Sequence, residues 1–285
     1  MRKNIRIKIT LILIISLVFL TNCNVGKKDE ITEPDEIKNK LLNVMLEQGN
    51  YSFSGKSSMG FDEENIEDVV QFNGFINNKE AMYLKLNITA LEGIPEESIE
   101  VVQLPEKMMV KYPNETDWAE ENELDLFLGE IGNINPEKIL SDIQNISIET
   151  AIIDEKEGKK GLSVKIDPEV TKEKIKEQIR SSFAEMGNLT EEEIQEMRDS
   201  GLTDEEIADI QEEMQGQVQG IEDMLGTLEV DTNFQIYYDP DDYLINEIAQ
   251  SITTNYEMQG IKINEKTITS YQFSEYGKKK ELPAT

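Results

Sequence analysis

The chain has 285 residues, with 28 Lys and Arg against 58 Asp and Glu, a formal net charge of −30. This excludes nucleic acids as partners, because their phosphates are neutralised by Lys and Arg. The chain has no histidine and one cysteine, which removes the commonest general base and metal ligand and any internal disulfide. Carboxylate catalysis of the glycosidase kind stays open in principle. We nevertheless expect a binding protein, with no catalytic residues, metal or cofactor, and not an enzyme.

The N-terminus, residues 1–22, has the three parts of a secretory signal peptide. Four basic residues precede an apolar run over residues 9–20. As a helix this run would be about 18 Å long, too short for a bilayer core of roughly 30 Å. The alternatives are an uncleaved anchor and an ordinary signal peptide followed by an incidental cysteine.

Cys23 directly follows the signal peptide, in the sequence Leu20-Thr21-Asn22-Cys23. The sequence resembles the bacterial lipobox, in which a Leu lies three residues before a Cys that receives a diacylglycerol thioether. Asn22 departs from the small residue usual at that position. The resemblance implies lipidation of Cys23, with a further N-terminal acyl chain such as palmitate. It also implies a protein held on the extracytoplasmic face of the cell membrane, since several acyl chains anchor stably.

Residues 23–35 comprise the lipidated cysteine and a polar tether. Loss of the signal peptide leaves 24 basic against 58 acidic residues, a net charge of −34. An anionic membrane surface would repel such a domain. We therefore expect the acyl chains, and not surface charge, to attach it to the membrane.

The first part of the folded region, which spans residues 36–276, begins with a helix. Apolar residues recur at helical spacing from Ile37 to Leu46, and Gly49 is a typical C-terminal stop. Alternation of apolar and polar residues then predicts antiparallel strands with short connections. These strands are expected at 51–59, 68–76, 81–88, 99–104 and 108–112.

The pattern changes at Trp118. Apolar residues between Leu124 and Ile131 predict a short helix, and Asn135-Pro136 predicts the start of another, with Asn135 as its N-cap. Strands are predicted again at 147–153 and 162–166.

Residues 169–226 form an acidic helical insertion, with 17 acidic and 5 basic residues. Thr190 with Glu193, and Thr203 with Glu206, have the spacing of capping boxes. The second box opens a helix with a continuous apolar stripe, and the simplest expectation is that the insertion covers the sheet. The chain then returns to strands at 228–238, 243–256 and 261–273, followed by a polar tail at 277–285.

The whole pattern predicts one α+β domain. About ten twisted antiparallel strands should curl into a strongly curved sheet, an unclosed β-barrel. Its concave side would cup helices, and would be filled by them or left as a cavity.

Several segments carry, by their order along the chain, a resemblance to a known family. They are Tyr51-Ser-Phe-Ser-Gly55, Met82-Tyr-Leu-Lys-Leu86, the Trp118 segment, and Tyr237-Tyr-Asp239 with Tyr243-Leu244. Together with the lipobox and the N-terminal helix, they make the chain similar to the LolA-like and LppX/LprG-like lipoprotein superfamily. The closer resemblance is to an uncharacterised branch of Gram-positive lipoproteins. Since the superfamily binds acyl chains in its cup, the resemblance implies a lipid-like ligand, although the acidic insertion departs from the compact carriers.

Candidate ligand contacts lie in the insertion and near its predicted cup. Methionines adapt to varied apolar ligands, and four fall in the insertion: Met186, Met197, Met214 and Met224. Trp118 could guard the cup or lie at a membrane interface. Ordinary core packing is the alternative for all five.

Asp239-Pro-Asp-Asp242 could offer oxygens to Ca²⁺. It lacks the spaced ligands, the Gly and the terminal Glu of an EF-hand loop. A hairpin turn fits this sequence better, so no metal site is expected.

Two functions are compatible with these features. The leading one is a membrane-anchored lipoprotein that binds a lipid or acyl chain between its sheet and helices, which requires an apolar pocket of several hundred Å³. The alternative is an envelope accessory or sensor lipoprotein that binds a protein partner. That alternative predicts a filled core and an exposed apolar patch on the helices of 169–226.

Overall fold

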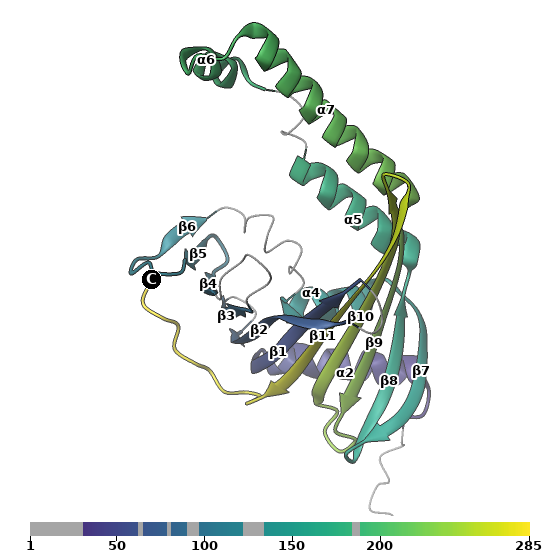
Figure 1. Cartoon of the computed structure of the whole chain (residues 1–285). Helices are drawn as coiled ribbons and strands as arrows, with labels where there is room; N and C mark the ends of the chain where they lie inside the picture. The colour runs from purple at the N-terminus through teal and green to yellow at the C-terminus, as the bar shows by residue number, and fades with distance from the viewer. Residues whose placement is uncertain (1–30, 62–64, 79–80, 90–96, 122–133, 184–188) are drawn as a thin grey trace, which may run out of the picture.

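The computed structural model describes residues 31–61, 65–78, 81–89, 97–121, 134–183 and 189–285 (Figure 1). Within these residues the chain forms one antiparallel sheet of eleven strands, together with five helices. The strands are β1 (Asn50–Gly60), β2 (Glu67–Asn77), β3 (Ala81–Ile88), β4 (Glu97–Gln103), β5 (Met108–Lys111), β6 (Ala119–Glu121), β7 (Ser147–Lys156), β8 (Lys159–Ile166), β9 (Glu229–Tyr238), β10 (Ile245–Met258) and β11 (Ile261–Ser274). The helices are α2 (Pro34–Gln48), α4 (Pro136–Asn145), α5 (Pro168–Phe183), α6 (Glu191–Asp199) and α7 (Asp204–Thr227).

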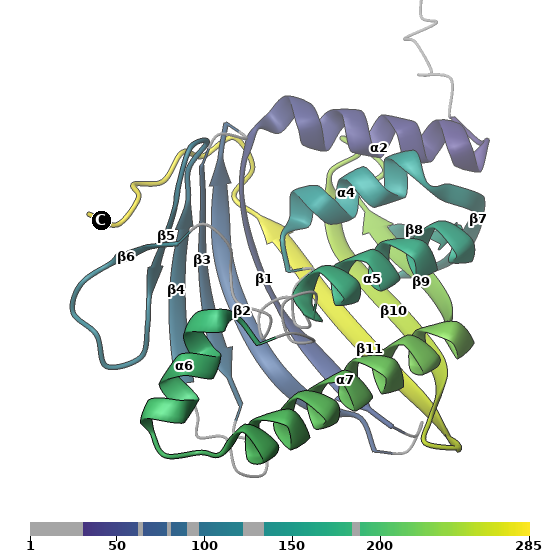
Figure 2. The same ribbon diagram turned by 90° about the horizontal axis from the view of Figure 1, so that it is seen from above.

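Two meanders make up the sheet, whose strand order is β6-β5-β4-β3-β2-β1-β11-β10-β9-β8-β7. They join where β1 pairs with β11, with Phe53 opposite Phe273 and Gly55 opposite Tyr271. Strands β6 and β7 are the outer strands, so the sheet does not close. Figure 2 shows its strong curvature and the helices on its concave side. The predicted α+β fold with an unclosed, curved sheet is confirmed.

Two details of the sheet differ from the expectation, and one predicted helix cannot be compared with it. Strand β6 was not predicted, because three residues are too few to show an alternation. Strand β10 starts at Ile245 rather than at Tyr243, because Tyr243 has a φ of 60° and its amide donates to Asp239 O within the turn. The helix predicted between Leu124 and Ile131 lies outside the described residues.

Helices α2 and α4 begin and end as their sequences predict. Gly49 has a φ of 64°, the left-handed conformation that terminates a helix. The Asn135 side chain accepts a hydrogen bond from the Glu137 amide at 2.9 Å, which caps α4. Their apolar sides are buried in the main core, so these two helices are fixed to the sheet.

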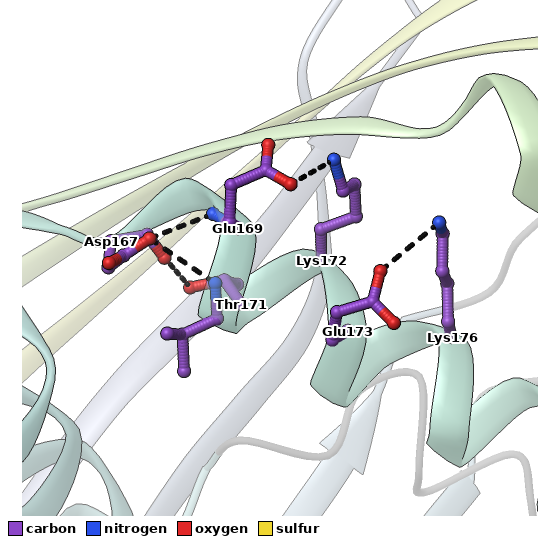
Figure 3. A network of polar contacts seen from close by, with 7 residues as sticks. Asp167, Glu169, Thr171, Lys172, Glu173 and Lys176 are labelled. Atoms are coloured by element: carbon purple, nitrogen blue, oxygen red, sulfur yellow. Dashed lines mark hydrogen bonds and ion pairs between the residues drawn. The ribbon is translucent and has the colours of Figure 1, made fainter.

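Helix α5 starts at Pro168, and the side chain of the preceding Asp167 satisfies free amides of the first turn (Figure 3). The Asp167 carboxylate accepts from the Glu169 amide at 3.0 Å. One turn on, Lys172 pairs with Glu169 at 2.5 Å, and Lys176 with Glu173 at 3.3 Å. These are exposed pairs that add little individually, and they set the charge of the α5 surface.

Helix α7 opens with the predicted capping box of Thr203 and Glu206. The other predicted capping box pairs Thr190 with Glu193, and the Glu193 side chain lies outside the described part of the structure. The expectation that the insertion covers the sheet holds for α5 and for the C-terminal end of α7. There, Ile175 and Ile179 of α5 and Leu225 of α7 pack with Leu228 and Val230. In Figure 1, α6 and the first half of α7 extend away from the strands.

Two glycines in the middle of the sheet allow aromatic rings from neighbouring strands to pack directly over them. A Cβ at Gly55 would lie 1.9 Å from the Ser270 carbonyl oxygen and 2.6 Å from the Phe72 ring. A Cβ at Gly74 would lie 2.2 Å from the Tyr83 carbonyl oxygen and 2.7 Å from the Phe53 ring. Neither position has room for a side chain.

We therefore predict that Gly55→Ala destabilises the domain by about 2 kcal/mol or more, since a backbone oxygen must move. The matched control is Gly216→Ala on α7, where a Cβ meets nothing within 4 Å, and which should be neutral or stabilising by up to about 1 kcal/mol. Urea denaturation of residues 24–285 measures both. Equal effects of the two substitutions would contradict this packing.

Candidate ligand-binding site

The concave face of the sheet carries an aromatic group at its centre, contributed by three neighbouring strands. The rings of Phe72 and Tyr271 lie 5.0 Å apart between centroids, and those of Phe53 and Phe72 lie 6.4 Å apart. All three side chains are at most 2% exposed. The centre of the cup is therefore closed to solvent, and the chain's own rings occupy it.

Helices α2 and α4 close one end of this face. Leu41 and Met45 of α2, with Ile139 and Ile143 of α4, are at most 2% exposed and share one core with the aromatic group. Figure 2 shows the two helices side by side across the strands. The stripe predicted from the spacing of apolar residues in α2 is what seals this end.

A pocket remains where α2, α4 and the start of β1 meet. Its volume is about 240 Å³, below the roughly 300–1,000 Å³ typical of sites that enclose a whole small molecule. Its apolar walls come from three elements and comprise Leu42, Met45, Leu46, Tyr51 and Leu140. Leu46 is 36% exposed and leaves the apolar wall accessible. The pocket is too small to enclose a complete lipid.

Acidic and neutral polar groups line the remaining wall, on α4. Glu137, Ser141 and Gln144 lie there. Burial raises the pKa of the Tyr51 hydroxyl far above its usual value, and the negative charge of Glu137 raises this pKa further. Tyr51 is therefore neutral at all physiological pH values. An anionic head group would meet the Glu137 charge, whereas an uncharged one would not.

A band of polar side chains crosses the concave face beyond the aromatic group. It consists of Ser57, Thr269, Gln250 and Thr232, all at most 7% exposed. Ser57 Oγ and Thr269 Oγ1 are hydrogen bonded at 3.0 Å. Thr232 Oγ1 is buried without a hydrogen-bond partner among the described residues. The band separates the main core from the smaller cluster around Leu225.

Sequence reasoning missed this band, although a signal was present. Thr232 interrupts the apolar alternation of β9 between Val230 and Phe234, and Gln250 interrupts that of β10 between Ile248 and Ile252. Polar residues at inward positions of two strands predict a polar zone once the strands are known to be neighbours.

The sequence-predicted contact residues do not come together. Met224 packs against the Leu225 cluster, while Met197 on α6 and Met214 on α7 are half-buried. Trp118, also half-buried, precedes β6 at the outer edge of the sheet, far in strand order from the β10 contact of α7. Met186 lies outside the described residues. None of the four described residues lines the α2–α4 pocket.

Cys23 and the signal segment lie in residues 1–30, outside the described structure. Among the residues that the structure describes, no helix has the length and apolarity to cross a membrane. Lipidation of Cys23 therefore stays a prediction from the sequence.

The acidic turn after β9 forms the hairpin predicted for it. Asp239 Oδ1 accepts from the Asp241 amide at 3.0 Å, and Asp242 Oδ1 accepts from the Leu244 amide at 3.0 Å. Lys159 pairs with Asp239 at 2.8 Å, and the hydrogen bond from Lys159 lowers the pKa of that carboxyl. In the described ranges, no three acidic or cysteine side chains are grouped as metal ligands would be.

No protein-family model matches the chain, and a search of curated proteins finds no match. Solved structures with similarity over most of the chain include LprF from Mycobacterium bovis, which is 10% identical with a TM-score of 0.38, over 88% of this chain and 97% of LprF. A LolA superfamily protein from Nitrosomonas europaea is 7% identical with a TM-score of 0.28, over 89% and 96%. A DUF1329 family protein from Desulfovibrio piger is 10% identical with a TM-score of 0.26, over 85% and 92%.

Two of these neighbours carry the names that the sequence resemblance gave, LprF and the LolA superfamily. Their TM-scores are too low to transfer a ligand or a site to this chain. The candidate site therefore rests on the pocket between α2 and α4.

The Tyr51 hydroxyl predicts a pH dependence. Because its folded-state pKa lies above the unfolded value of about 10, its contribution to stability is complete below pH 10 and is lost as the pH rises further. In Tyr51→Phe the unfolding free energy should fall less steeply above pH 10, by up to about 1.4 kcal/mol per pH unit. Urea denaturation from pH 9 to 11 tests this, and identical slopes in both proteins would contradict the burial of this hydroxyl.

Proposed function

We propose that this protein is a membrane-anchored extracytoplasmic lipoprotein that binds a hydrophobic, lipid-like ligand at the α2–α4 end of its cup. The observation that carries the proposal is the pocket of about 240 Å³ walled by Leu42, Met45, Leu46, Tyr51 and Leu140. Three of these side chains are at most 3% exposed, so an inserted apolar chain would meet walls already held in place.

The ligand should be uncharged at the end nearest α4. Glu137 lies on the pocket wall, and the whole chain is strongly acidic, so an anionic lipid would be repelled on approach. A glycerol ester or another neutral amphiphile satisfies both conditions. Its acyl end would enter the pocket, while the exposed Ser141 and Gln144 would lie beside its polar part.

The proposal is of a binding protein and not of an enzyme. The chain has no histidine, and the polar side-chain groups at the pocket are one carboxylate, one amide and the hydroxyls of Ser141 and Tyr51. Such groups can hold an ester or hydroxyl in place by hydrogen bonds. They do not include an activated nucleophile with its base.

If the ligand binds in this pocket, a bulky side chain that fills the pocket should weaken ligand binding. Ser141→Trp places a large ring at the pocket wall from an exposed position and should weaken binding of monododecanoylglycerol at least about tenfold, or 1.4 kcal/mol. The matched control is Lys138→Trp on the same helix, which is exposed and does not line the pocket. Fluorescence displacement on residues 24–285 gives both affinities. Equal affinities of the two variants would contradict this site.

Native mass spectrometry of residues 24–285 purified from cells provides the direct test of the ligand. The proposal predicts an added mass of a few hundred daltons that extraction with an apolar solvent removes. A clean apo mass, unchanged after incubation with monododecanoylglycerol, would argue against lipid binding.

The membrane anchor makes a separate prediction. Cells expressing the full chain and fed an alkyne fatty acid should label this protein in the membrane fraction, and Cys23→Ala should lose the label and the membrane retention together. Asn22→Ala is the control, because it keeps the acylated thiol and restores a small residue beside it. Label retained in Cys23→Ala would refute lipidation at that residue.

Binding of an envelope protein partner is the second candidate function. It is favoured by the filled centre of the cup, where Phe53, Phe72 and Tyr271 are buried. It is also favoured by the half-buried stripe of α7 at Ile210 and Met214, on the part of the helix that extends from the sheet (Figure 1). A lipid-free protein with an unchanged α2–α4 pocket would support this alternative.

A further inference from the structure

Strand β7 is one of the two outer strands of the sheet. Among the described residues it pairs only with β8, and it is ten residues long. In an antiparallel pair, about half of the backbone N–H and C=O groups of an outer strand point away from its neighbour. The register is regular only from Glu149 to Ile153, with a shift on either side, so these five residues offer a continuous row of such groups.

The middle of β7 lacks part of the usual protection of an edge strand. Exposed edges commonly carry Pro, charged side chains or β-bulges, or are very short. The register shifts of β7 lie on either side of residues 149–153, and within these five residues only Glu149 is charged. Strand β7 has no Pro, and its one Lys, Lys156, is at its end and pairs with Glu247 at 2.7 Å. Instead Ile148 is 56% exposed and Ile152 is 58% exposed. These are large apolar side chains beside backbone groups that have no strand partner within the described part of the chain.

The exposed isoleucines extend the apolar surface of the cup. Ile152 lies opposite Leu162 on β8, and Thr150 lies opposite Val164. Leu162 and Val164 are completely buried. A strand added beside β7 would extend this apolar surface by one more strand and cover Ile152.

Helix α2 holds β7 in position without covering the edge. Asp35 accepts a hydrogen bond from Thr150 Oγ1 at 2.8 Å, and Lys38 donates to Ser147 Oγ at 2.8 Å. The hydrogen bond from Thr150 and that from Lys38 lower the pKa of Asp35. The strand is thus fixed from the concave side while its isoleucines remain accessible.

The negative charge around β7 determines which kind of segment can bind at this edge. Glu149, Asp154 and Glu155 are exposed on β7, and the chain as a whole carries a net charge of −30. A second copy would bring the same acidic strand and the same Asp35 to the junction. An extended segment with alternating apolar and basic residues meets both the isoleucines and the carboxylates.

We propose that the outer edge of β7 is a docking site for an extended, basic and apolar segment of a partner protein, which adds a twelfth strand to the sheet. The added strand would pair by its backbone, place apolar side chains beside Ile148 and Ile152, and place Lys or Arg beside Glu149. This mode of recognition is strand addition at an open sheet edge. It is independent of any ligand in the α2–α4 pocket.

The test uses the full chain in phosphatidylcholine nanodiscs, with empty nanodiscs as background. The probe is a labelled, end-capped ten-residue peptide of alternating Val and Lys. Its anisotropy should show saturable binding at physiological salt, and hydrogen exchange should slow at the amides of β7. A peptide of the same charge with two central Val replaced by Pro, which lacks those N–H groups, should bind at least about tenfold more weakly.

Matched variants separate edge binding from general attraction to an acidic chain. Ile152→Asp should weaken the Val-Lys peptide at least tenfold, whereas Ile261→Asp, equally exposed at the β10–β11 turn, should change it less than twofold. Equal losses in the two variants, equal binding of the Pro peptide, or no protection of β7 would overturn the proposal. Concentration-dependent pairing of the chain without peptide, abolished by Ile152→Asp, would also overturn it in favour of a second copy.

Discussion

The packing of Phe53 and Phe72 over the two mid-sheet glycines sets the shape of the whole domain. Gly74 brings the Phe53 ring against β2, and Gly55 brings the Phe72 ring against β1, at distances that leave no space for a Cβ. Tyr271 completes the group from β11. Because β1 and β11 join the two meanders, the aromatic group lies at the junction of the sheet's two halves. Because Gly55 and Gly74 carry no side chain, the rings of neighbouring strands can pack over them at this junction.

The filled centre of the concave face limits where helices and a pocket can lie. The aromatic group already fills the centre of the concave face. Helices α2 and α4 pack at one end of this face, and the C-terminal part of α7 packs at the other. The polar band with Thr232 and Gln250 lies between these regions. Space for an apolar ligand remains at the α2–α4 end, and the open edge of β7 lies beside the same helix α2. The proposed ligand site and the proposed partner site would therefore share one supporting helix.

The sequence predicted the elements well because each is specified locally. Alternation marked the strands, Asn135 and Gly49 marked helix ends, and the Thr203 box marked the start of α7. The ligand contacts were predicted poorly, because contact depends on which strands become neighbours. Methionines in an amphipathic helix favour an apolar contact but cannot say whether the sheet, a ligand or solvent lies opposite. Pocket-lining residues such as Tyr51 and Leu140 have the sequence pattern of ordinary core residues. They line a pocket only because α2 and α4 meet beside β1.

Methyl NMR of the methionines tests the central claim most directly. With ¹³C-methyl methionine in residues 24–285 and added monododecanoylglycerol, the account predicts a shifted Met45 methyl resonance and nuclear Overhauser contacts between this methyl and the acyl chain. Met45 lines the pocket and is 1% exposed, whereas Met258, at the β10–β11 turn, is 48% exposed and should not respond. Contacts to Met197 or Met214 with Met45 unchanged would place the ligand on the helical insertion instead and contradict the account.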